Sequence, residues 1–407
     1  MLKFLKQVVN LDKELKECEK EIKNLKAKIG EKRQTPKPLK THLGDKRTKA
    51  QTKGLKDKMQ LKGHFGKIYG VDWHHDSDHL LSICQDGYLI VICSFFFCYV
   101  LILLPTTFFP LRTNWVMAAA FSPNGSLTAV GGLDNICTVY NIAEAYGDHS
   151  FVKSDPQFTQ AHYELSGHEA YLSCCKFMDE NTILTTSGDA TAGSWDIAKE
   201  RRVNTFAEHT QDIMSVCVDP SSQLFITGSI DRAAKVWDIR TAARSVLSFS
   251  KFHLNDINWF EPSFQTNKQI KIYTNQYTKI TQITIFFFFV ACICWLLHSV
   301  ELFPNKRSFV SGSDDASCRL FDLRAYQQIA MYQCENNYSV SSVDCSVSGY
   351  YIYAGYSDGN AVLTWDTIRE EKAYSLSHLR QAARLKVSPS GHAVAVGCWD
   401  YSVHIWA

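Results

Sequence analysis

The chain has 407 residues and a formal net charge of +2, a length that permits one to three domains. Its 14 cysteines include Cys137, Cys174 and Cys217 inside apolar, strand-like runs, which argues against the disulfide framework of a small secreted protein. No long apolar run follows Met1–Lys6, and charged residues recur from Asp12 onward, so no secretory signal peptide is predicted and a reducing, cytoplasmic compartment is expected.

The first 29 residues are predicted to form one amphipathic helix. Its apolar residues step alternately by four and three, at Phe4, Val8, Leu11, Leu15, Cys18, Ile22, Leu25 and Ile29. This spacing is the a/d seam of a coiled coil. Because a lone helix of this length is marginal in water, we expect it to need a partner helix, the alternative being that it folds back on its own domain. Gly30, Pro36 and Pro38 mark its end.

Residues 30–57 are predicted to be a basic linker. Residues 1–62 hold 19 Lys and Arg against 8 Asp and Glu, whereas the rest of the chain holds 24 against 33. The N-terminal arm is therefore basic and the body acidic, which suggests an acidic or membrane-surface neighbour for the arm. A solvated, partly disordered linker is the favoured interpretation of the same run.

From residue 58 onward the sequence repeats. Trp-Asp pairs begin at Trp195, Trp237 and Trp365, and an Asp precedes each pair position by six or seven residues. In four units a His lies 21 or 22 residues before that Asp. Seven Asp anchors predict seven units. The His and Asp residues of these units are His64, Asp86, Asp134, His168, Asp189, His209, Asp231, Asp315, Asp358, His378 and Asp400.

Each unit is predicted to be a four-stranded sheet, as in residues 224–237, where apolar runs alternate with turn residues. The Asp carboxylate is expected to bind the His, which orients a Ser or Thr and the Trp. Because the pair recurs once per unit, it is interpreted as structural and not as catalytic. The predicted fold is an all-β, seven-bladed WD-repeat β-propeller over 58–407, preceded by an N-terminal coiled-coil helix. Residues 58–62 are expected to complete the blade of Trp406.

Two apolar segments interrupt the repeat, at 93–110 and 259–299. They contain Phe95–Leu104 and Ile285–Leu297. As membrane spans both runs are shorter than the roughly 20 residues a helix needs, and as extra core they have no partner. The favoured interpretation is translated non-coding sequence, because pyrimidine-rich tracts encode Phe runs.

No catalytic motif is present: the sequence has no phosphate-binding Gly loop, nucleophile elbow or zinc-protease helix. The segment His74-His75-Asp76-Ser77-Asp78-His79 contains metal-ligand residue types. Adjacent side chains on a hairpin turn are expected to diverge, so no metal site is predicted. The chain is predicted to be a non-enzymatic binding protein without a cofactor.

Several strings resemble the β subunit of heterotrimeric G proteins more closely than WD-repeat proteins at large. They are Leu61-Lys-Gly-His-Phe-Gly-Lys-Ile-Tyr69, Trp115-Val-Met117, Gly131-Gly-Leu-Asp-Asn-Ile-Cys137, Tyr171-Leu-Ser-Cys-Cys175 and Gly312-Ser-Asp-Asp-Ala-Ser-Cys-Arg-Leu-Phe-Asp-Leu-Arg324. The resemblance extends from about residue 61 to 407, apart from the two apolar segments, and includes the N-terminal heptad helix.

This resemblance implies two protein-binding surfaces. The helix would coil around a lipidated γ subunit through Leu11, Leu15, Cys18, Ile22, Leu25 and Ile29. One propeller face would bind the GDP-bound α subunit or, after its release, effectors. Carried over by position, that face comprises Phe65, Lys67, Tyr69, Trp115, Met117, Leu133, Asn135, Tyr171, Asp212, Met214, Asp256, Asn258, Asp314 and Trp399. An aromatic and Met centre with a charged rim has the composition of a binding hot spot.

The sequence departs from the family at Tyr88 and Gln381, where the family has Lys and Arg, and at Val91–Cys93, where its Trp-Asp pair is missing. The expected function is a signal-transducing β subunit in receptor signalling, at the inner face of the plasma membrane. No nucleic acid is expected, and membrane contact is expected only through lipidated partners. The alternatives are a general WD-repeat scaffold of another cytosolic complex, and a membrane protein if both apolar runs insert.

Overall fold

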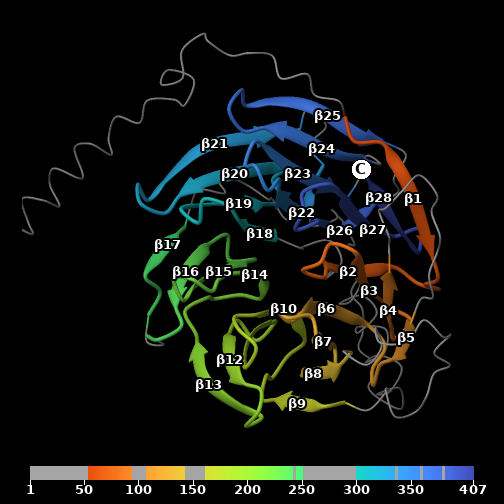
Figure 1. Ribbon diagram of the computed structural model, residues 1–407. Helices are drawn as coiled ribbons and strands as arrows, with labels where there is room; N and C mark the ends of the chain where they lie inside the picture. Colours follow the sequence, from red (N-terminus) through yellow and green to blue (C-terminus); the bar gives the residue numbers. More distant parts are fainter. Residues whose placement is uncertain are drawn as a thin grey trace, which may run out of the picture.

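Seven four-stranded antiparallel sheets form a ring in the computed structural model (Figure 1). The structure describes residues 54–93, 107–142, 161–241, 244–250, 299–334, 338–357, 361–377 and 381–407. The predicted seven-bladed, all-β propeller is therefore confirmed. The expected N-terminal helix, nearly all of the basic linker, and Asp256, Asn258, Asp358 and His378 lie outside the described residues.

The blades are numbered in chain order, and their strands run from the axis outward. Blade one contains β2 (Ile68–Trp73), β3 (His79–Cys84), β4 (Tyr88–Cys93) and β5 (Thr107–Pro110). Blade two contains β6 (Val116–Phe121), β7 (Leu127–Gly132), β8 (Ile136–Asn141) and β9 (Tyr163–Ser166). Blade three contains β10 (Leu172–Phe177), β11 (Thr182–Ser187), β12 (Ala192–Asp196) and β13 (Arg201–Phe206).

The remaining blades repeat this order. Blade four contains β14 (Ile213–Asp219), β15 (Leu224–Ser229), β16 (Ala234–Asp238) and β17 (Leu247–Phe249). Blade five contains β18 (Ser299–Leu302), β19 (Ser308–Gly312), β20 (Ser317–Asp322) and β21 (Gln327–Gln333). Blade six contains β22 (Val340–Cys345), β23 (Tyr351–Tyr356), β24 (Ala361–Asp366) and β25 (Glu371–Ser377). Blade seven contains β26 (Ala382–Val387), β27 (Val394–Cys398), β28 (Ser402–Trp406) and β1 (Asp57–Lys62).

The first two strands of a blade, counted from the axis, are largely buried because neighbouring blades pack against each other. All six residues of β2 are buried, and so are the last five of β11 and of β15. The outer strand β13 instead alternates exposed with partly buried residues. The large side chains of the repeat fill the space between blades: Trp195, Trp237 and Phe321 are each at most 1% exposed.

Blade seven closes the ring with a strand from the start of the propeller. β1 pairs antiparallel with β28, with Met59 opposite Ile405 and Leu61 opposite Val403. Figure 1 shows β1 beside β28 at the outer edge of this blade. The expectation that residues 58–62 supply the missing outer strand is confirmed. This pairing satisfies the backbone of β28, which would otherwise be an exposed sheet edge.

The structure corrects the limits of both apolar segments. Thr107–Pro110 form β5 and pair with β4, with Phe109 opposite Leu89. Phe109 is 2% exposed and packs in the core between blades one and two, so this strand belongs to the propeller. Cys93 likewise ends β4, and Ser299 begins β18. The predicted limit at Pro110 was wrong because the buried strand β5 and the run Phe95–Leu104 before it are both rich in Phe.

Both long apolar runs, Phe95–Leu104 and Ile285–Leu297, lie outside the described residues. Among the residues that the structure describes, no helix is both long enough and apolar enough to cross a membrane.

Candidate protein-binding face

A hydrogen-bonded network recurs where each blade receives the chain from the blade before it. In blade three, His168 Nδ1 lies 2.7 Å from Asp189 Oδ2 and its Nε2 lies 2.9 Å from Thr185 Oγ1. Trp195 Nε1 donates to the same Thr185 oxygen at 2.7 Å. This is the arrangement that the His, Asp and Trp spacing predicts. Its buried polar atoms are mutually satisfied, so they hold one packing arrangement.

Blade four contains the same network. His209 Nδ1 is 2.7 Å from Asp231 Oδ2, its Nε2 is 2.8 Å from Thr227 Oγ1, and Trp237 Nε1 donates to Thr227 at 2.8 Å. Burial alone would raise the pKa of Asp231, but the hydrogen bond and charge of His209, together with the backbone amides of Thr210 and Ala233, outweigh burial and lower it. The carboxylate is therefore the stable form in the folded protein.

In blades one and seven, other residues replace members of this His–Asp–Thr–Trp network. In blade one His64 binds Asp86 at 3.2 Å and Ser82 at 2.9 Å, while the Trp position is Ile92, which has no donor. In blade seven the imidazole of His404, from β28 itself, lies 3.2 Å from Asp400. This intrablade partner was not anticipated.

In blade five Arg319 Nη2 donates to Asp315 at 3.0 Å. Blade two has Asp134 with a backbone partner, Ile136 N, at 3.5 Å, and burial raises the pKa of this Asp134 carboxyl. The recurring Asp is thus retained even where its partner changes from His to Arg or to a backbone amide.

The same Asp residues fix the loops that lead into the innermost strands. The backbone N–H groups of Phe65, Glu169 and Thr210 donate to Asp86, Asp189 and Asp231 respectively, at 3.0 to 3.2 Å. Two residues beyond these amides lie Lys67, Tyr171 and Asp212, all of them expected on the protein-binding face. The structural network therefore sets the backbone position of the residues that the face presents.

Aromatic side chains lie on this face around blades one, two and seven. Phe65 is 85% exposed. Lys67 Nζ lies 3.8 Å from the centroid of the Trp399 ring, a cation–π contact between blades one and seven. Trp115 is half-buried and stacks on Tyr69, with 6.4 Å between ring centroids and 26° between planes. Aromatic rings and one lysine from blades one, two and seven thus lie on the same face.

The backbone conformation at Trp115 leaves part of its indole ring accessible on this face. Its φ is +65°, a left-handed conformation uncommon for a bulky residue, and its amide donates to Gln85 O at 3.4 Å. A Cβ on Gly132 would lie 2.4 Å from the Trp115 carbonyl oxygen, so only glycine fits there. Neighbouring blades thus hold Trp115 in an unusual conformation that leaves part of its ring accessible.

On blades three and four the face is polar. Tyr171 Oη donates to Asp212 Oδ2 at 2.7 Å and lies 3.6 Å from Met214 Sδ. Asn135, with φ of +62°, donates to Glu169 O at 3.2 Å. Leu133, beside it in the β7–β8 turn, and Met117 are half-buried.

Not every expected contact residue is exposed. Tyr69 is 5% exposed, Met214 is 1% and Tyr171 is 9%. Tyr69 supports Trp115 from below, and Met214 lies beneath the Tyr171–Asp212 hydrogen bond. The predicted aromatic and Met centre thus contains accessible and buried residues: Phe65 and Trp115 are accessible, whereas Tyr69 and Met214 are buried. Sequence alone does not distinguish these two layers, because both contain large apolar side chains.

Asp314, beside the structural Asp315, is an unusual acid on this face. Its pKa is raised to about 7, first by burial and then by the charge of Asp315, with a Ser339 hydrogen bond opposing the rise. Asp315 itself is held by Arg319. The two acids are adjacent, but only Asp315 has a described cationic partner within ion-pair distance.

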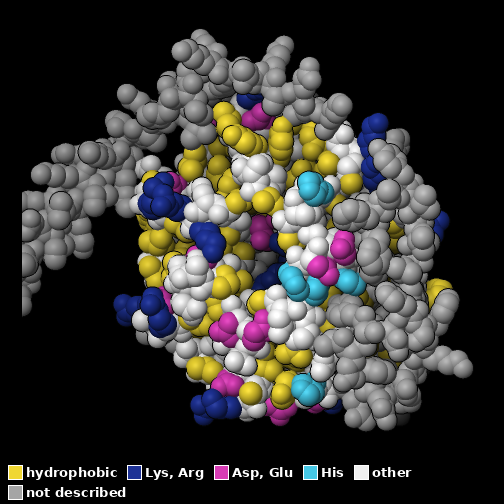
Figure 2. All heavy atoms as spheres, in the orientation of Figure 1, with side chains coloured by type: hydrophobic (Ala, Val, Ile, Leu, Met, Phe, Trp, Pro, Cys, Tyr) yellow, Lys and Arg dark blue, Asp and Glu magenta, His cyan; other side chains and the backbone are white. Residues whose placement is uncertain are grey.

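A second polar group lines the central channel and was not predicted. Lys386 Nζ lies 2.9 Å from Glu301 and 3.3 Å from Asp344, and Lys176 Nζ lies 3.1 Å from Asp72. Burial alone would lower the pKa of Lys386, but the nearby carboxylates raise it above its ordinary value. Figure 2 shows acidic and basic side chains in the hollow at the centre of the ring.

A sequence signal for this group exists once the strands are aligned. Asp72, Lys176, Asp344 and Lys386 are each the fifth residue of an innermost strand. A charged residue at the same place in several otherwise buried strands indicates that the position faces the axis.

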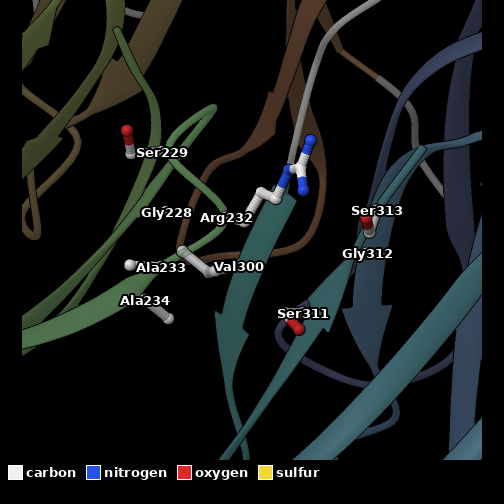
Figure 3. Close-up of a pocket in the computed structure, with 9 residues that line it drawn as sticks. All are labelled: Gly228, Ser229, Arg232, Ala233, Ala234, Val300, Ser311, Gly312 and Ser313. Carbon is white, nitrogen blue, oxygen red and sulfur yellow. The ribbon is translucent and has the colours of Figure 1, made fainter. Parts of the chain in front are cut away.

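A shallow groove separates blades four and five (Figure 3). Its lining is Gly228, Ser229, Arg232, Ala233, Ala234, Val300, Ser311, Gly312 and Ser313. These side chains offer hydroxyl groups and one guanidinium, and this lining includes no carboxylate, imidazole or thiol. The groove thus has no pair of groups suited to acid–base catalysis.

Comparison with known proteins assigns most of the chain to one family. Residues 12–272, more than half of the chain, match the family model described as G protein beta WD-40 repeat protein, and residues 374–407 match the WD domain, G-beta repeat. The chain belongs to the G protein β WD-40 repeat family. The family expected from the sequence strings is thereby confirmed.

Plant members of this family are similar along most of their length. The guanine nucleotide-binding protein subunit beta of Arabidopsis thaliana is 32% identical over 363 residues, covering 85% of this chain and 82% of the relative. The subunit of Zea mays is 32% identical over 366 residues, with the same coverage. The solved WD40 β-propeller domain of Doa1 has a TM-score of 0.64 at 16% identity, covering 88% of this chain and 98% of that one, which shows the fold alone.

For this family member we predict that the substitution Asp314→Asn increases stability above neutral pH. A carboxyl whose folded pKa exceeds its unfolded value loses stability as pH rises between about 4 and 7. With Asn the loss disappears, so the free energy of unfolding should rise by about 1 kcal/mol at pH 8, discounted for partial exposure, and stay unchanged at pH 4. Urea unfolding at both pH values measures this.

Asp322→Asn is the matched control, because Asp322 lies in the same blade and pairs with Arg324 at 3.3 Å. It should give no gain at pH 8. An equal effect of Asp314→Asn at pH 4 and pH 8 would show that Asp314 is not the titrating group.

Proposed function

We propose that this chain is the β subunit of a heterotrimeric G protein. In this proposal the face around Phe65, Lys67, Trp115 and Asp314 binds the GDP-bound α subunit or an effector, and the N-terminal segment binds a γ subunit. The chain acts as a non-catalytic scaffold in receptor signalling, at the inner face of the plasma membrane. The names of the plant relatives and the family model support the general assignment.

One observation carries the proposal: the described face residues, from blades one, two, three, four, five and seven, lie at the same end of the strands. Phe65 and Lys67 precede β2, Leu133 and Asn135 lie between β7 and β8, and Trp399 follows β27. In an antiparallel blade the entry to the first strand and the turn between the second and third are at one end. The residues therefore share one face although they are far apart in sequence.

The composition of this face also suits a reversible protein contact. Phe65 is almost fully exposed, which is uncommon for a large apolar side chain without a partner. Lys67 and Asp212 add charged groups to the same end of the blades. If the α subunit and effectors bind the same residues, an effector can bind this face only after the α subunit is released.

Capture by an α subunit tests the proposal. The full chain is co-expressed with a γ subunit of the same organism, and the purified complex is passed over immobilised α subunit of that organism. We expect capture with GDP-loaded α and at least tenfold weaker capture after loading with a non-hydrolysable GTP analogue. Equal capture in both states would contradict the proposed cycle, and no capture in either state would contradict the α-binding face.

The γ assignment is tested separately. A chain lacking residues 1–53 retains every described strand and should fail to co-purify with γ. If it co-purifies as well as the full chain, γ binds elsewhere and the proposed role of the heptad helix is wrong.

A further inference from the structure

The β2–β3 turn of blade one brings together two imidazoles and a carboxylate. His74 and His79 flank the turn and are joined by a backbone hydrogen bond, His74 N to His79 O, at 2.9 Å. Ser77, with φ of +65°, closes it. The Nδ1 atoms of His74 and His79 lie 2.8 and 2.6 Å from the same oxygen, Asp76 Oδ2. The expectation that adjacent side chains on this turn diverge is therefore wrong.

The second oxygen of Asp76 fixes the carboxylate. Oδ1 accepts the backbone N–H of Asp78 at 2.8 Å and of His79 at 3.1 Å. Oδ2 is thereby directed at the two imidazoles. The three candidate ligand atoms, His74 Nδ1, Asp76 Oδ2 and His79 Nδ1, all lie within 4.8 Å of one another.

The polar groups around His74 Nδ1 are compatible with a bound cation. The Asp76 backbone N–H lies 3.3 Å from His74 Nδ1 and can only donate, so that nitrogen presents its lone pair. An ionised carboxylate oxygen also presents only lone pairs, yet it lies 2.8 Å from the same nitrogen. A metal ion coordinated by both atoms removes this conflict, and a shared proton is the competing occupant.

Blade two holds His74 in place. A Cβ on Gly125 would lie 1.6 Å from His74 Nε2, so this imidazole sits directly against the glycine backbone. The ring also packs edge-on to Phe121, with 5.3 Å between centroids. His74 is thus a rigid, buried ligand, whereas the side chains of Asp76 and His79 are 30% and 20% exposed and can adjust to an ion arriving from solvent.

We propose that His74, Asp76 and His79 bind a divalent transition-metal ion, with Zn²⁺ as the best match. Two imidazoles and one carboxylate are ligands that Zn²⁺ takes at about 2.0 to 2.2 Å, with water completing a tetrahedron. Tetrahedral ligands at that distance are about 3.3 Å apart, so the present spacing widens by roughly half an ångström on binding. Mg²⁺ and Ca²⁺ prefer sites made entirely of oxygen.

The site lies on the face opposite the protein-binding face. Lys67 precedes β2 and His74 follows it, so the six residues of that strand separate them by about 20 Å. Figure 2 shows His side chains beside acidic ones over β2 and β3. An ion here would hold the β2–β3 turn of blade one without touching the α-subunit contacts, so failure of the metal site would not affect the proposed function.

Metal titration of the intact chain tests the site. The full-length protein, treated with chelator and then dialysed, is titrated with Zn²⁺ by calorimetry and with Co²⁺ by visible absorption. We expect one saturable ion per chain, with d–d bands and no sulfur-to-cobalt charge-transfer band. Asp76→Asn and His79→Gln should each weaken binding at least tenfold.

The controls separate this site from others. His392→Asn removes an exposed His on another turn and should leave the affinity unchanged. Asp76→Asn keeps an oxygen for the amides of Asp78 and His79, so its melting temperature without metal should match that of the unaltered protein. No saturable binding, binding retained in both variants, or a sulfur charge-transfer band, which would place the ion on a cysteine, would each overturn the proposal.

Discussion

Replacing Trp115 with alanine should weaken capture of the GDP-bound α subunit by at least about 2 kcal/mol, or roughly thirtyfold in Kd. Trp115 has the features of a binding anchor: a large, partly accessible ring near the centre of the face, held by its backbone and by stacking on Tyr69. Its loss would remove the contact area of the indole and would also expose Tyr69 to water. Surface plasmon resonance on immobilised α subunit measures the change, and we expect it mainly in the dissociation rate.

Two variants control for this result. Tyr350→Ala removes a 56% exposed aromatic from the β22–β23 turn at the opposite end of the blades and should leave capture unchanged. Trp115→Phe keeps a ring that can stack on Tyr69 and should retain part of the affinity. Circular dichroism and the melting temperature establish that each variant folds. Unchanged capture by folded Trp115→Ala would remove Trp115 from the interface and would place the anchor elsewhere on the face.

The fold was accessible from the sequence because its main signal is repetition. One Asp per blade, usually six residues before the position that Trp most often occupies, predicts the number of blades, and the hydrogen bonds of Asp189 and Asp231 show why the spacing recurs. The closing strand followed from the need to pair the last edge. Its limits, Asp57–Lys62, agree with the expected 58–62 within one residue.

The features that the sequence did not predict are those set by where individual side chains lie in the folded protein. The family resemblance, carried over by position, placed Tyr69 and Met214 in the protein-binding face, but only the structure shows that both are buried. The His74–Asp76–His79 cluster was dismissed because side chains on a turn usually diverge, whereas here the carboxylate is turned back by two amides of its own loop. The limit of the apolar run before Pro110 was missed because burial between blades one and two selects the same Phe-rich composition.

Removing Asp231 should produce the largest loss of stability. With alanine in its place, His209 Nδ1 and the backbone N–H groups of Thr210 and Ala233 lose the acceptor that they share, at 2.7 to 3.1 Å. A buried donor without a partner costs about 1 to 3 kcal/mol. Because water can reach some of these groups after truncation, we expect Asp231→Ala to lower the free energy of unfolding by about 3 kcal/mol at pH 7, measured by urea denaturation.

The stability difference between Asp231→Ala and the unaltered protein should be smaller in acid. The folded pKa of Asp231 lies below its ordinary value because His209 and the amides of Thr210 and Ala233 together outweigh burial. The stabilising effect of Asp231 is therefore present above about pH 4 and is lost as pH falls through the folded pKa. The gap between Asp231→Ala and the unaltered protein should therefore be smaller at pH 3 than at pH 7. Asp238→Ala, seven residues later in the same blade, removes an ion pair with exposed Arg240 and should change stability by no more than about 0.5 kcal/mol. If both variants lost equal stability, backbone disruption of blade four would explain the effect better than the His–Asp network, and the loop bearing Asp212 would have to be held by other contacts.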